Sequence, residues 1–316
     1  MSWHREKLFA DCVLERSPLQ WAFQRIARSK LVILAYHGVD DLANFRRQLD
    51  YILGSRTPIS LQQLVDAIYA NAALPPRPVL ITFDDGYRSV YELGAQELEK
   101  RRVPAAIFVV TSLLGTTRPF WWEEVEALLL SGARARGLPP SPSAALNALK
   151  RAPNDLRLDL IDQLRAASSA KVTTPQLTST ELRHLEAAGI EVGSHTHTHP
   201  CLDRCDPRTI DDEIRTSTEE LQKVLGARPR AFAYPNGNYH PLAEHELRAL
   251  DYQVGFLFDH HVCEDIARTP LRLSRLRVST ATPAPRFATI LSGLHPAIHS
   301  LRQAADAWFY GRPRTR

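Results

Sequence analysis

The sequence predicts a parallel α/β fold of barrel type in one large domain. Short apolar runs with charged borders, typical of strands buried on both faces, alternate with segments that have helical spacing. The 316 residues are 44% apolar and 23% charged, which suits a large core. Polar residues that could carry chemistry follow several of the apolar runs. Because the C-terminal ends of parallel strands converge on one face, we expect these residues to meet there.

Strands and helices alternate along most of the chain. The apolar runs predict strands over residues 31–36, 79–83, 105–110 and 190–194, a short strand within 231–237 that a turn closes, and a strand over 271–278. Helical spacing predicts helices around residues 45–53, 61–73, 90–101 and 211–225. Thr178 and Glu181 have the spacing of a capping box before a further helix, which ends at Gly189.

Three regions depart from this alternation. Residues 118–175 contain an aromatic and acidic helix start and a Pro- and Ser-rich linker over 137–143, so we expect a helical insertion there. We expect residues 1–30 to form an N-terminal helical extension and residues 281–316 to form a C-terminal helical tail. The main domain then spans residues 31–280.

Charge and targeting signals argue against several functions. The net charge is +4, and no basic stripe is interleaved with aromatic residues, so we expect no nucleic-acid partner. The N-terminus has no apolar signal core, and no stretch reaches 18 apolar residues. Neither an export signal nor a membrane span is therefore expected, and the cytoplasm is the predicted compartment. The sequence does not indicate an oligomeric state.

One N-terminal segment combines apolar and basic side chains. We favour a helix packed on the domain, and contact with a membrane surface is the alternative. The segment holds the apolar residues Trp21, Phe23 and Ile26 and the basic residues Arg25, Arg28 and Lys30.

A pair of carboxylates follows the strand predicted over residues 79–83. Asp84 and Asp85 are adjacent, and adjacent side chains of an extended chain point in opposite directions unless the backbone turns, which Gly86 permits. Two carboxylates held close disfavour ionisation unless a cation intervenes. The pair therefore suits a site in which one carboxylate binds a metal and the other accepts a proton; the alternative is a surface turn. Its position directly after a buried apolar run favours the site.

Three histidines alternate with threonines after the strand predicted over residues 190–194. His195 and His199 are four residues apart, so a helical turn would place both imidazoles on one side and His197 on the other. An extended backbone would instead align all three. Two imidazoles with one carboxylate leave coordination positions open for water and substrate, as in catalytic zinc sites. We therefore expect a catalytic metal site.

These two segments resemble the motifs of the polysaccharide deacetylase family, whose NodB-homology domain is also called carbohydrate esterase family 4. Residues 82–86 read Thr-Phe-Asp-Asp-Gly, and residues 195–199 match the family's His-(Ser/Thr)-x-x-His pattern. The similarity extends from about residue 31 to about residue 278, with an insertion over 118–175. It implies an α/β fold that is a distorted (β/α) barrel of the NodB-homology type.

The resemblance also implies the roles of the site residues. Asp85, His195 and His199 would bind one divalent metal ion, foremost Zn²⁺, with Co²⁺, Ni²⁺ or Mn²⁺ as alternatives. Asp84 would be the catalytic base. His197 would be a neighbour that does not bind the metal.

The family's third motif is only partly present. Residues 233–237 read Ala-Tyr-Pro-Asn-Gly, where many members begin with an arginine that steadies the base. Arg275 is our candidate replacement, and a solvent-facing arginine is the alternative. By the same alignment, the backbone N–H of Asn236 would help to stabilise the oxyanion, and Tyr234 would line the substrate groove.

The family's general acid comes from a Leu-x-His element near the C-terminus. Here the Leu-His and Ile-His pairs at residues 294–295 and 298–299 lie in the predicted tail, beyond the last strand. His37 is the better candidate, because it ends the strand over residues 31–36 and the element comes first in some relatives. The alternative is a histidine that only caps the strand.

The predicted reaction is removal of an acetyl group from an N-acetylated sugar in a glycan, oligosaccharide or sugar conjugate by metal-activated water. Asp84 would take a proton from the water, and His37 would donate one to the leaving nitrogen. One alternative is an O-acetyl esterase on a polysaccharide, which needs the general acid less. The other is a catalytically inactive carbohydrate-binding relative. The expected partner is an N-acetylated carbohydrate.

Overall fold

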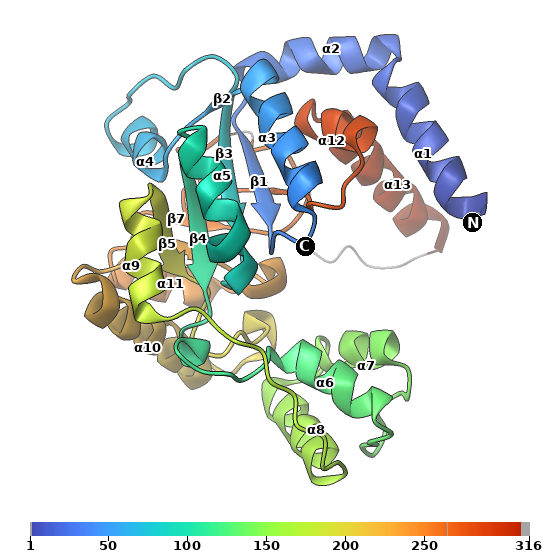
Figure 1. The fold of residues 1–316 in the computed structure, drawn as a ribbon, viewed down its shortest axis with the longest axis vertical. Coiled ribbons are helices and arrows are strands. Elements are labelled where there is room, and N and C mark those ends of the chain that lie inside the picture. Colours follow the sequence, from blue (N-terminus) through green and yellow to red (C-terminus); the bar gives the residue numbers. More distant parts are fainter. Residues whose placement is uncertain (1, 264, 311–316) are drawn as a thin grey trace.

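A curled parallel sheet forms the centre of the fold (Figure 1). The computed structural model describes residues 2–263 and 265–310, and within them eight strands form this sheet in the order β7-β6-β5-β4-β3-β1-β8, with β2 beside β3. Neighbouring strands are parallel, which confirms the predicted parallel α/β fold. The strands are β1 (Val32–Tyr36), β2 (Thr57–Pro58), β3 (Pro78–Phe83), β4 (Ala105–Val109), β5 (Ile190–Ser194), β6 (Ala231–Ala233), β7 (Val254–Phe256) and β8 (Leu276–Arg277).

The described ranges leave out residue 1, residue 264 and residues 311–316. The last six residues of the predicted C-terminal tail therefore lie outside the described residues. Within the described ranges, none of the helices combines the length and the apolar composition that crossing a bilayer requires.

The two edges of the sheet approach each other through the segment before β8. The N–H of Leu273 donates to the Gly255 carbonyl (2.7 Å), and the Leu273 carbonyl accepts the N–H of Leu257 (2.9 Å). Leu273 thus forms an isolated parallel bridge with Phe256 of β7, while β8 pairs with β1. These contacts bend the sheet into a partly closed barrel.

The strand predicted over residues 271–278 is shorter than expected. Only Leu276–Arg277 pairs with β1 among the described residues. The Asp259 carboxylate explains the break, because it accepts the Ser274 hydroxyl (2.7 Å) and the Arg275 N–H (3.3 Å) just before β8 begins. The sequence also does not predict β7, whose three residues include a glycine.

Helices connect the strands and cover the sheet (Figure 1). The predicted helices are confirmed with shifted ends; the one predicted over residues 90–101 begins as a π-helix over Val90–Gly94. The capping box of Thr178 and Glu181 is present, whereas α11 is not predicted from the sequence. The helices are α3 (Leu42–Ser55), α4 (Leu61–Tyr69), α5 (Ala95–Lys100), α9 (Ser179–Ala187), α10 (Pro207–Leu225) and α11 (Pro241–Ala249).

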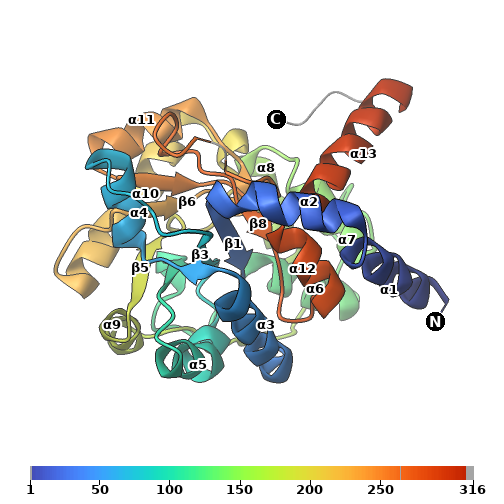
Figure 2. The ribbon, with the colours of Figure 1, turned by 90° about the horizontal axis from the view of Figure 1, so that it is seen from above.

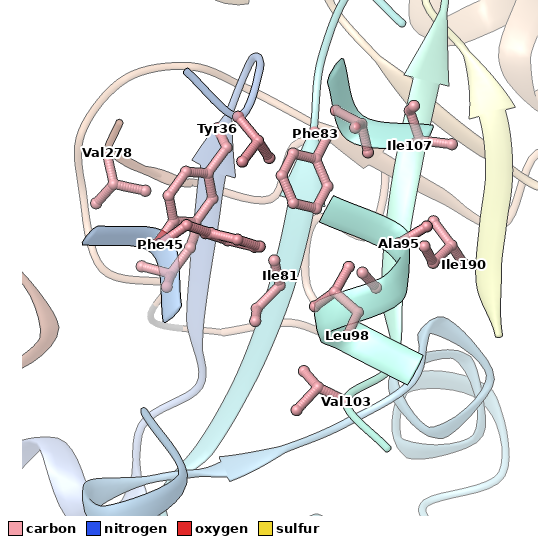
Figure 3. Close-up of a cluster of buried hydrophobic side chains, with 14 of the residues drawn as sticks. Tyr36, Phe45, Ile81, Phe83, Ala95, Leu98, Val103, Ile107, Ile190 and Val278 are labelled. Carbon is pink, nitrogen blue, oxygen red and sulfur yellow. The ribbon is translucent and has the colours of Figure 1, made fainter. Parts of the chain in front are cut away.

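One cluster of the core lies between the sheet and helices α3 and α5 (Figure 3). Tyr36 of β1, Phe45 of α3 and Phe83 of β3 are fully buried, with ring centres 5.5 to 6.1 Å apart. Burying an aromatic side chain stabilises a fold by roughly 1.5–3 kcal/mol. Because Tyr36 and Phe83 are the last residues of their strands, this packing fixes the positions of His37 and Asp84, which follow them.

Residues 118–175 contain three helices, as predicted for an insertion, grouped beyond the ends to which the strand arrows point (Figure 1). They have an apolar cluster of their own, to which Val125, Leu149 and Leu164 contribute fully buried side chains. The bounds of the insertion stay a prediction. The helices are α6 (Trp121–Leu130), α7 (Pro142–Leu149) and α8 (Asn154–Ala166).

The helices at the two ends of the chain pack against each other (Figure 2). The buried Gln20 amide donates to the Ala288 carbonyl (3.1 Å) and accepts the Ser292 hydroxyl (2.8 Å), which ties α2 to α12. The division into extension, main domain and tail stays a prediction. The four helices are α1 (Ser2–Glu15), α2 (Pro18–Ile26), α12 (Ala284–Leu291) and α13 (Leu294–Tyr310).

Candidate metal centre

The turn after β3 directs two adjacent carboxylates to one side. Asp85 has φ 70° and Gly86 has φ 86°, and the Gly86 N–H donates to the Asp84 carbonyl (2.9 Å). This left-handed backbone removes the alternation that an extended chain would impose. A Cβ at Gly86 would also lie 3.0 Å from a methyl group of Val109. The predicted turn at Gly86 is therefore confirmed, and Asp85 shares its unusual conformation.

The histidine loop after β5 is neither a helical turn nor an extended chain. Thr196 (φ 68°) and His199 (φ 59°) adopt left-handed conformations, and the His199 N–H donates to the Thr196 hydroxyl (3.0 Å). His195 and His199 face each other, with ring centres 4.7 Å apart. His197 lies apart from them and contacts the Thr111 hydroxyl through Nδ1 (3.0 Å).

Glu213 of α10, which is not among the site residues predicted from the sequence, holds this loop. Its carboxylate accepts the N–H groups of His197 (2.8 Å) and Thr198 (2.7 Å) and also the Thr198 hydroxyl. Glu213 lies on the buried face of α10, beside Ile210 and Ile214. An acidic residue within the apolar stripe of a helix was the available signal, because a buried carboxylate needs hydrogen-bond partners.

Asp85, His195 and His199 form a buried cluster. The Nε2 atoms of His195 and His199 each lie 3.3 Å from Oδ1 of Asp85, and one ligand atom from each of the three residues lies within 4.8 Å of the others. Nδ1–H of His195 donates to the Ala233 carbonyl (2.7 Å), which directs Nε2 toward Asp85. Oδ1 of Asp85 has no hydrogen-bond partner among the described residues. This orphaned oxygen and the mixed donor set fit a divalent cation such as Zn²⁺.

The electrostatics of the cluster also suit a cation. Burial raises the pKa of Asp85, but the imidazoles of His195, His199 and His37 together lower it by more, so this carboxylate is ionised. Burial lowers the pKa of His199 to about 4, which keeps its imidazole neutral and able to coordinate. Burial also lowers the pKa of His195, but the carboxylates of Asp85 and Asp84 raise it above its ordinary value. A bound cation would take the place of the His195 proton.

Arg275 binds the second carboxylate. Its two terminal nitrogens donate to the two oxygens of Asp84, each over 2.7 Å, and its Nε–H donates to the Leu257 carbonyl (2.7 Å). The side chain of Arg275 is fully buried, so the alternative of a solvent-facing arginine is wrong. Burial raises the pKa of Asp84, but Arg275, His195 and His37 together lower it by more, which leaves the carboxylate ionised. Three phenylalanine rings surround the guanidinium: Phe108, Phe256 and Phe258.

In the strand order of the sheet, Arg275 and Ala233 lie on opposite sides of β3, the strand that Asp84 follows. Ala233 ends β6, whereas Arg275 immediately precedes β8, which lies next to β1. Ala233 still serves the cluster through its backbone carbonyl, which accepts the His195 hydrogen bond. The replacement of the motif-three arginine by Arg275 stays a prediction, for which the contacts with Asp84 give a geometric basis.

His37 lies at the mouth of the cluster. Its Nε2 is 3.9 Å from Oδ2 of Asp85, its ring meets the edge of Phe258, and 44% of its side chain is exposed. The two tail histidines contact a different residue: Nδ1 of His295 lies 3.0 Å from Nε2 of His260, and the ring of His299 lies 5.4 Å from that of His260. Of the candidates for the general acid, His37 is the one in contact with the cluster.

The predicted substrate contacts after β6 differ in their exposure. Tyr234 is fully buried against Phe232 and Tyr239, and its hydroxyl has no hydrogen-bond partner within the described ranges. A fully buried side chain does not line an open groove, so we assign Tyr234 no contact with substrate. Asn236 is partly exposed in a left-handed turn (φ 54°), and its role stays a prediction.

The first helix of the insertion contacts the cluster. The centre of the Trp122 ring lies 4.6 Å from that of the His199 ring, and Trp122 stacks on Phe120 with ring centres 4.8 Å apart. In addition, Nε1–H of Trp121 donates to the His199 carbonyl (3.2 Å). These aromatic residues therefore form one wall of the candidate metal centre. Their position in the sequence does not reveal this contact, because it depends on how α6 folds back on the strand ends.

A family model described as polysaccharide deacetylase matches residues 71–255, which is more than half of the chain. The chain belongs to the polysaccharide deacetylase family. Among curated proteins, the chitooligosaccharide deacetylase of Bradyrhizobium sp. (strain ANU 289) is 39% identical over 57 residues, which are 18% of this chain and 26% of that protein. The uncharacterized protein YlxY of Bacillus subtilis (strain 168) is 28% identical over 51 residues, 16% of each chain. The chain thus matches about a quarter or less of the length of these curated relatives.

Two of the solved structures that superpose on the chain illustrate the shared fold. The deacetylase PplD of Streptococcus pyogenes superposes with a TM-score of 0.59 at 20% identity, covering 84% of this chain and 98% of that one. IcaB from Ammonifex degensii superposes with a TM-score of 0.58 at 21% identity, covering 84% and 97%. These likenesses confirm the predicted fold, a distorted (β/α) barrel of the NodB-homology type.

Proposed function

We propose that the chain is a metal-dependent hydrolase that removes the acetyl group from an N-acetylated sugar in a glycan, an oligosaccharide or a sugar conjugate. One observation carries the proposal: two adjacent carboxylates have separate partners, with Asp85 facing two imidazoles and Asp84 held by Arg275. Family membership supports carbohydrate deacetylation. The proposed compartment remains the cytoplasm.

Asp85, His195 and His199 would hold the cation, foremost Zn²⁺. When bound, a divalent cation supplies a Lewis acid that lowers the pKa of water and polarises a carbonyl group. Asp84 is the general base that accepts the proton of the attacking water. The Arg275 contacts suit this role, because they keep the carboxylate ionised and in one orientation.

The leaving group needs a proton, because an amine anion is a poor leaving group. His37 donates this proton to the sugar nitrogen, since it is half-exposed at the mouth of the cluster. The backbone N–H of Asn236 helps to stabilise the oxyanion that forms on the acetyl group. The products are acetate and a free amino sugar.

The alternative of an inactive carbohydrate-binding relative rests on the missing motif-three arginine. The fully buried contact of Arg275 with Asp84 argues against it, because it supplies the same kind of support to the base. An O-acetyl esterase would use the same residues with less need for His37. The choice between the amide and the ester is therefore a matter for experiment.

Acetate release tests the proposal. The protein is treated with a chelator, and acetate is then measured with N-acetylated oligosaccharides and with O-acetylated sugars, with and without added Zn²⁺. We expect release from the amides that depends on the metal and that falls in His37→Ala. Release from esters alone, unaffected by His37→Ala, would favour the esterase. No release from either class with Zn²⁺ present would overturn the proposal.

A further inference from the structure

Exposed apolar side chains are concentrated on the two N-terminal helices. Within the described ranges 14 large apolar side chains are exposed, and six of them belong to α1 and α2, which together contain 23 residues. Figures 1 and 2 show both helices at the edge of the molecule. Isolated exposed apolar residues need no explanation, but such a concentration marks an interaction surface. The six are Leu8, Phe9, Val13, Leu19, Trp21 and Ile26.

Cations lie on α2 and directly after it. The Arg25 guanidinium lies 5.0 Å from the centre of the Trp21 ring. The Arg77 N–H donates to the carbonyl of Arg28 (2.9 Å), which places Arg77 beside the segment that directly follows α2. Among the described residues these cations form no ion pair. We call this region the α2 surface and define it by the apolar residues Leu19, Trp21 and Ile26 and the cations Arg25, Arg28, Lys30 and Arg77.

Among the described residues, the acidic side chains near the α2 surface are mostly engaged. Asp11 of α1 is buried and paired with Arg286 (2.9 Å). Glu15, at the end of α1, is partly exposed. Asp265 accepts the N–H groups of Ala267 and Arg268. The α2 surface therefore suits an anionic partner.

A hollow of about 760 Å³ lies beside the α2 surface, between α2, α13 and the loop before β8. Apolar side chains such as those of Phe23, Ile26 and Ala297 line it together with polar and charged ones, among them the cations Lys30, Arg268 and Arg272 and the carboxylate of Asp265. This volume lies within the range of small-molecule sites. A hollow that combines apolar side chains with cations suits the chain and headgroup of an anionic lipid, whereas a nucleic acid would not cover the exposed apolar side chains.

We propose that the α2 surface docks the protein on an anionic lipid bilayer. Helix α2 then lies at the level of the headgroups. Leu19 and Ile26, which are seven residues apart and share one face of the helix, point toward the acyl chains, whereas Trp21 and Arg25 lie together on another face at the level of the headgroups. The candidate metal centre lies at the other end of β1, because α2 leads into the start of this strand and His37 follows its end. The centre therefore stays open to a substrate in water. This inference does not depend on the proposed function.

Sedimentation with vesicles tests the proposal without measuring activity. We expect the full chain to bind vesicles of phosphatidylcholine mixed with phosphatidylglycerol, to bind phosphatidylcholine alone much more weakly, and to dissociate at high salt. Leu19→Ser with Ile26→Ser should weaken binding by about tenfold or more. Arg25→Gln with Arg28→Gln should weaken it by about fivefold for each cation removed.

Matched controls carry the same changes on the insertion. Leu130→Ser replaces a side chain that is 72% exposed, and Arg136→Gln replaces an exposed cation. Both should bind vesicles as the unchanged chain does. The proposal is overturned if the chain ignores phosphatidylglycerol at low salt, or if the α2 variants bind as well as the controls. It is also overturned if the α2 variants convert a dimer into a monomer, which would assign the surface to a second copy of the chain.

Discussion

Two charged side chains are buried and paired at the C-terminal end of β1, whereas two near its N-terminal end are exposed and unpaired within the described residues. At its C-terminal end Arg275 and Asp84 are buried and joined by two hydrogen bonds, whereas at its N-terminal end Arg25 and Arg28 are exposed and form no ion pair within the described ranges. A buried charge without a partner is costly, so the C-terminal end holds its groups in one geometry. The comparison teaches that one scaffold can fix the groups of a reaction centre at one end and leave cations available to an external partner at the other.

The largest expected effect belongs to the base. Asp84→Asn removes the proton acceptor and leaves the three candidate ligands in place, so turnover should fall by roughly 10²- to 10⁴-fold while the bound metal remains. His199→Ala should lose both turnover and metal, because it removes a ligand. Acetate release and metal analysis of both variants check this. Near-normal turnover of Asp84→Asn, or equal metal content in both variants, would contradict the assigned roles.

Breaking the buried pair should have the next largest effect. Arg275→Met leaves the Asp84 carboxylate buried without its partner, so the free energy of unfolding should fall by roughly 3–5 kcal/mol, as measured by urea unfolding. Arg275→Lys should retain part of the stability, because an ammonium group lacks the two-pronged geometry. Arg28→Gln is the matched control at the other end of β1 and should change stability by less than about 0.5 kcal/mol. Equal losses of unfolding free energy in Arg275→Met and Arg28→Gln would contradict the proposed difference between the two ends of β1.

The same pair predicts a pH dependence. Arg275 depresses the pKa of folded Asp84 below the ordinary value of 3.8, so the pair stabilises the folded state above that pH, and this contribution is lost as the pH falls below it. In Arg275→Met, burial instead raises the pKa of Asp84, so this contribution is absent. The difference in unfolding free energy between the two proteins should therefore shrink as the pH is lowered. A difference that stays constant with pH would show that the pair is not ionised.

Support of the histidine loop should have a smaller effect, on metal binding. Glu213→Gln replaces an acceptor oxygen with a donor facing the N–H groups of His197 and Thr198, so the affinity for Zn²⁺ should fall by about 10- to 100-fold. Glu191→Gln is the control, because Glu191 lies in β5, the strand that leads into the histidine loop, but its carboxylate pairs with Arg230. Isothermal titration with Zn²⁺ measures both. An unchanged affinity in Glu213→Gln would reduce this residue to a purely structural role.

The smallest effect on catalysis is expected at the α2 surface. Leu19→Ser with Ile26→Ser removes exposed side chains at the far end of β1, so stability should change by about 0.5 kcal/mol or less for each substitution. Turnover of a water-soluble substrate should not change, as measured by acetate release. A fall in turnover comparable with that of Asp84→Asn would show that the two ends of the strand are coupled.

The sequence predicts those site residues that directly follow buried strands. His37, Asp84 and His195 each come at the end of an apolar run, and parallel strands bring such ends together. Arg275 is also predictable once the arginine of the third motif is missing, because a base next to metal ligands needs a counter-charge. Its burial is not predictable, since alternation over residues 271–278 fits an exposed position equally well.

The remaining features depend on how helices pack. Glu213 reaches the histidine loop because α10 crosses beside β5, and Trp122 reaches His199 because the insertion folds back on the strand ends. The place of Glu213 within the apolar stripe of α10 indicates that it is buried but not which loop it contacts, and the contact of Trp122 leaves no spacing signal in the sequence. Tyr234 illustrates a different limit: directly after a three-residue strand, alternation is too short to tell a buried side chain from one that faces a groove.

The most direct measurement is anomalous scattering at the zinc absorption edge from crystals of the protein grown with Zn²⁺. The account predicts one strong peak about 2.0–2.2 Å from a carboxylate oxygen of Asp85 and from the Nε2 atoms of His195 and His199. Asp84 would remain bound to Arg275 beside it. A well-ordered loop with no peak between these three side chains, or zinc bound elsewhere, would contradict the central claim.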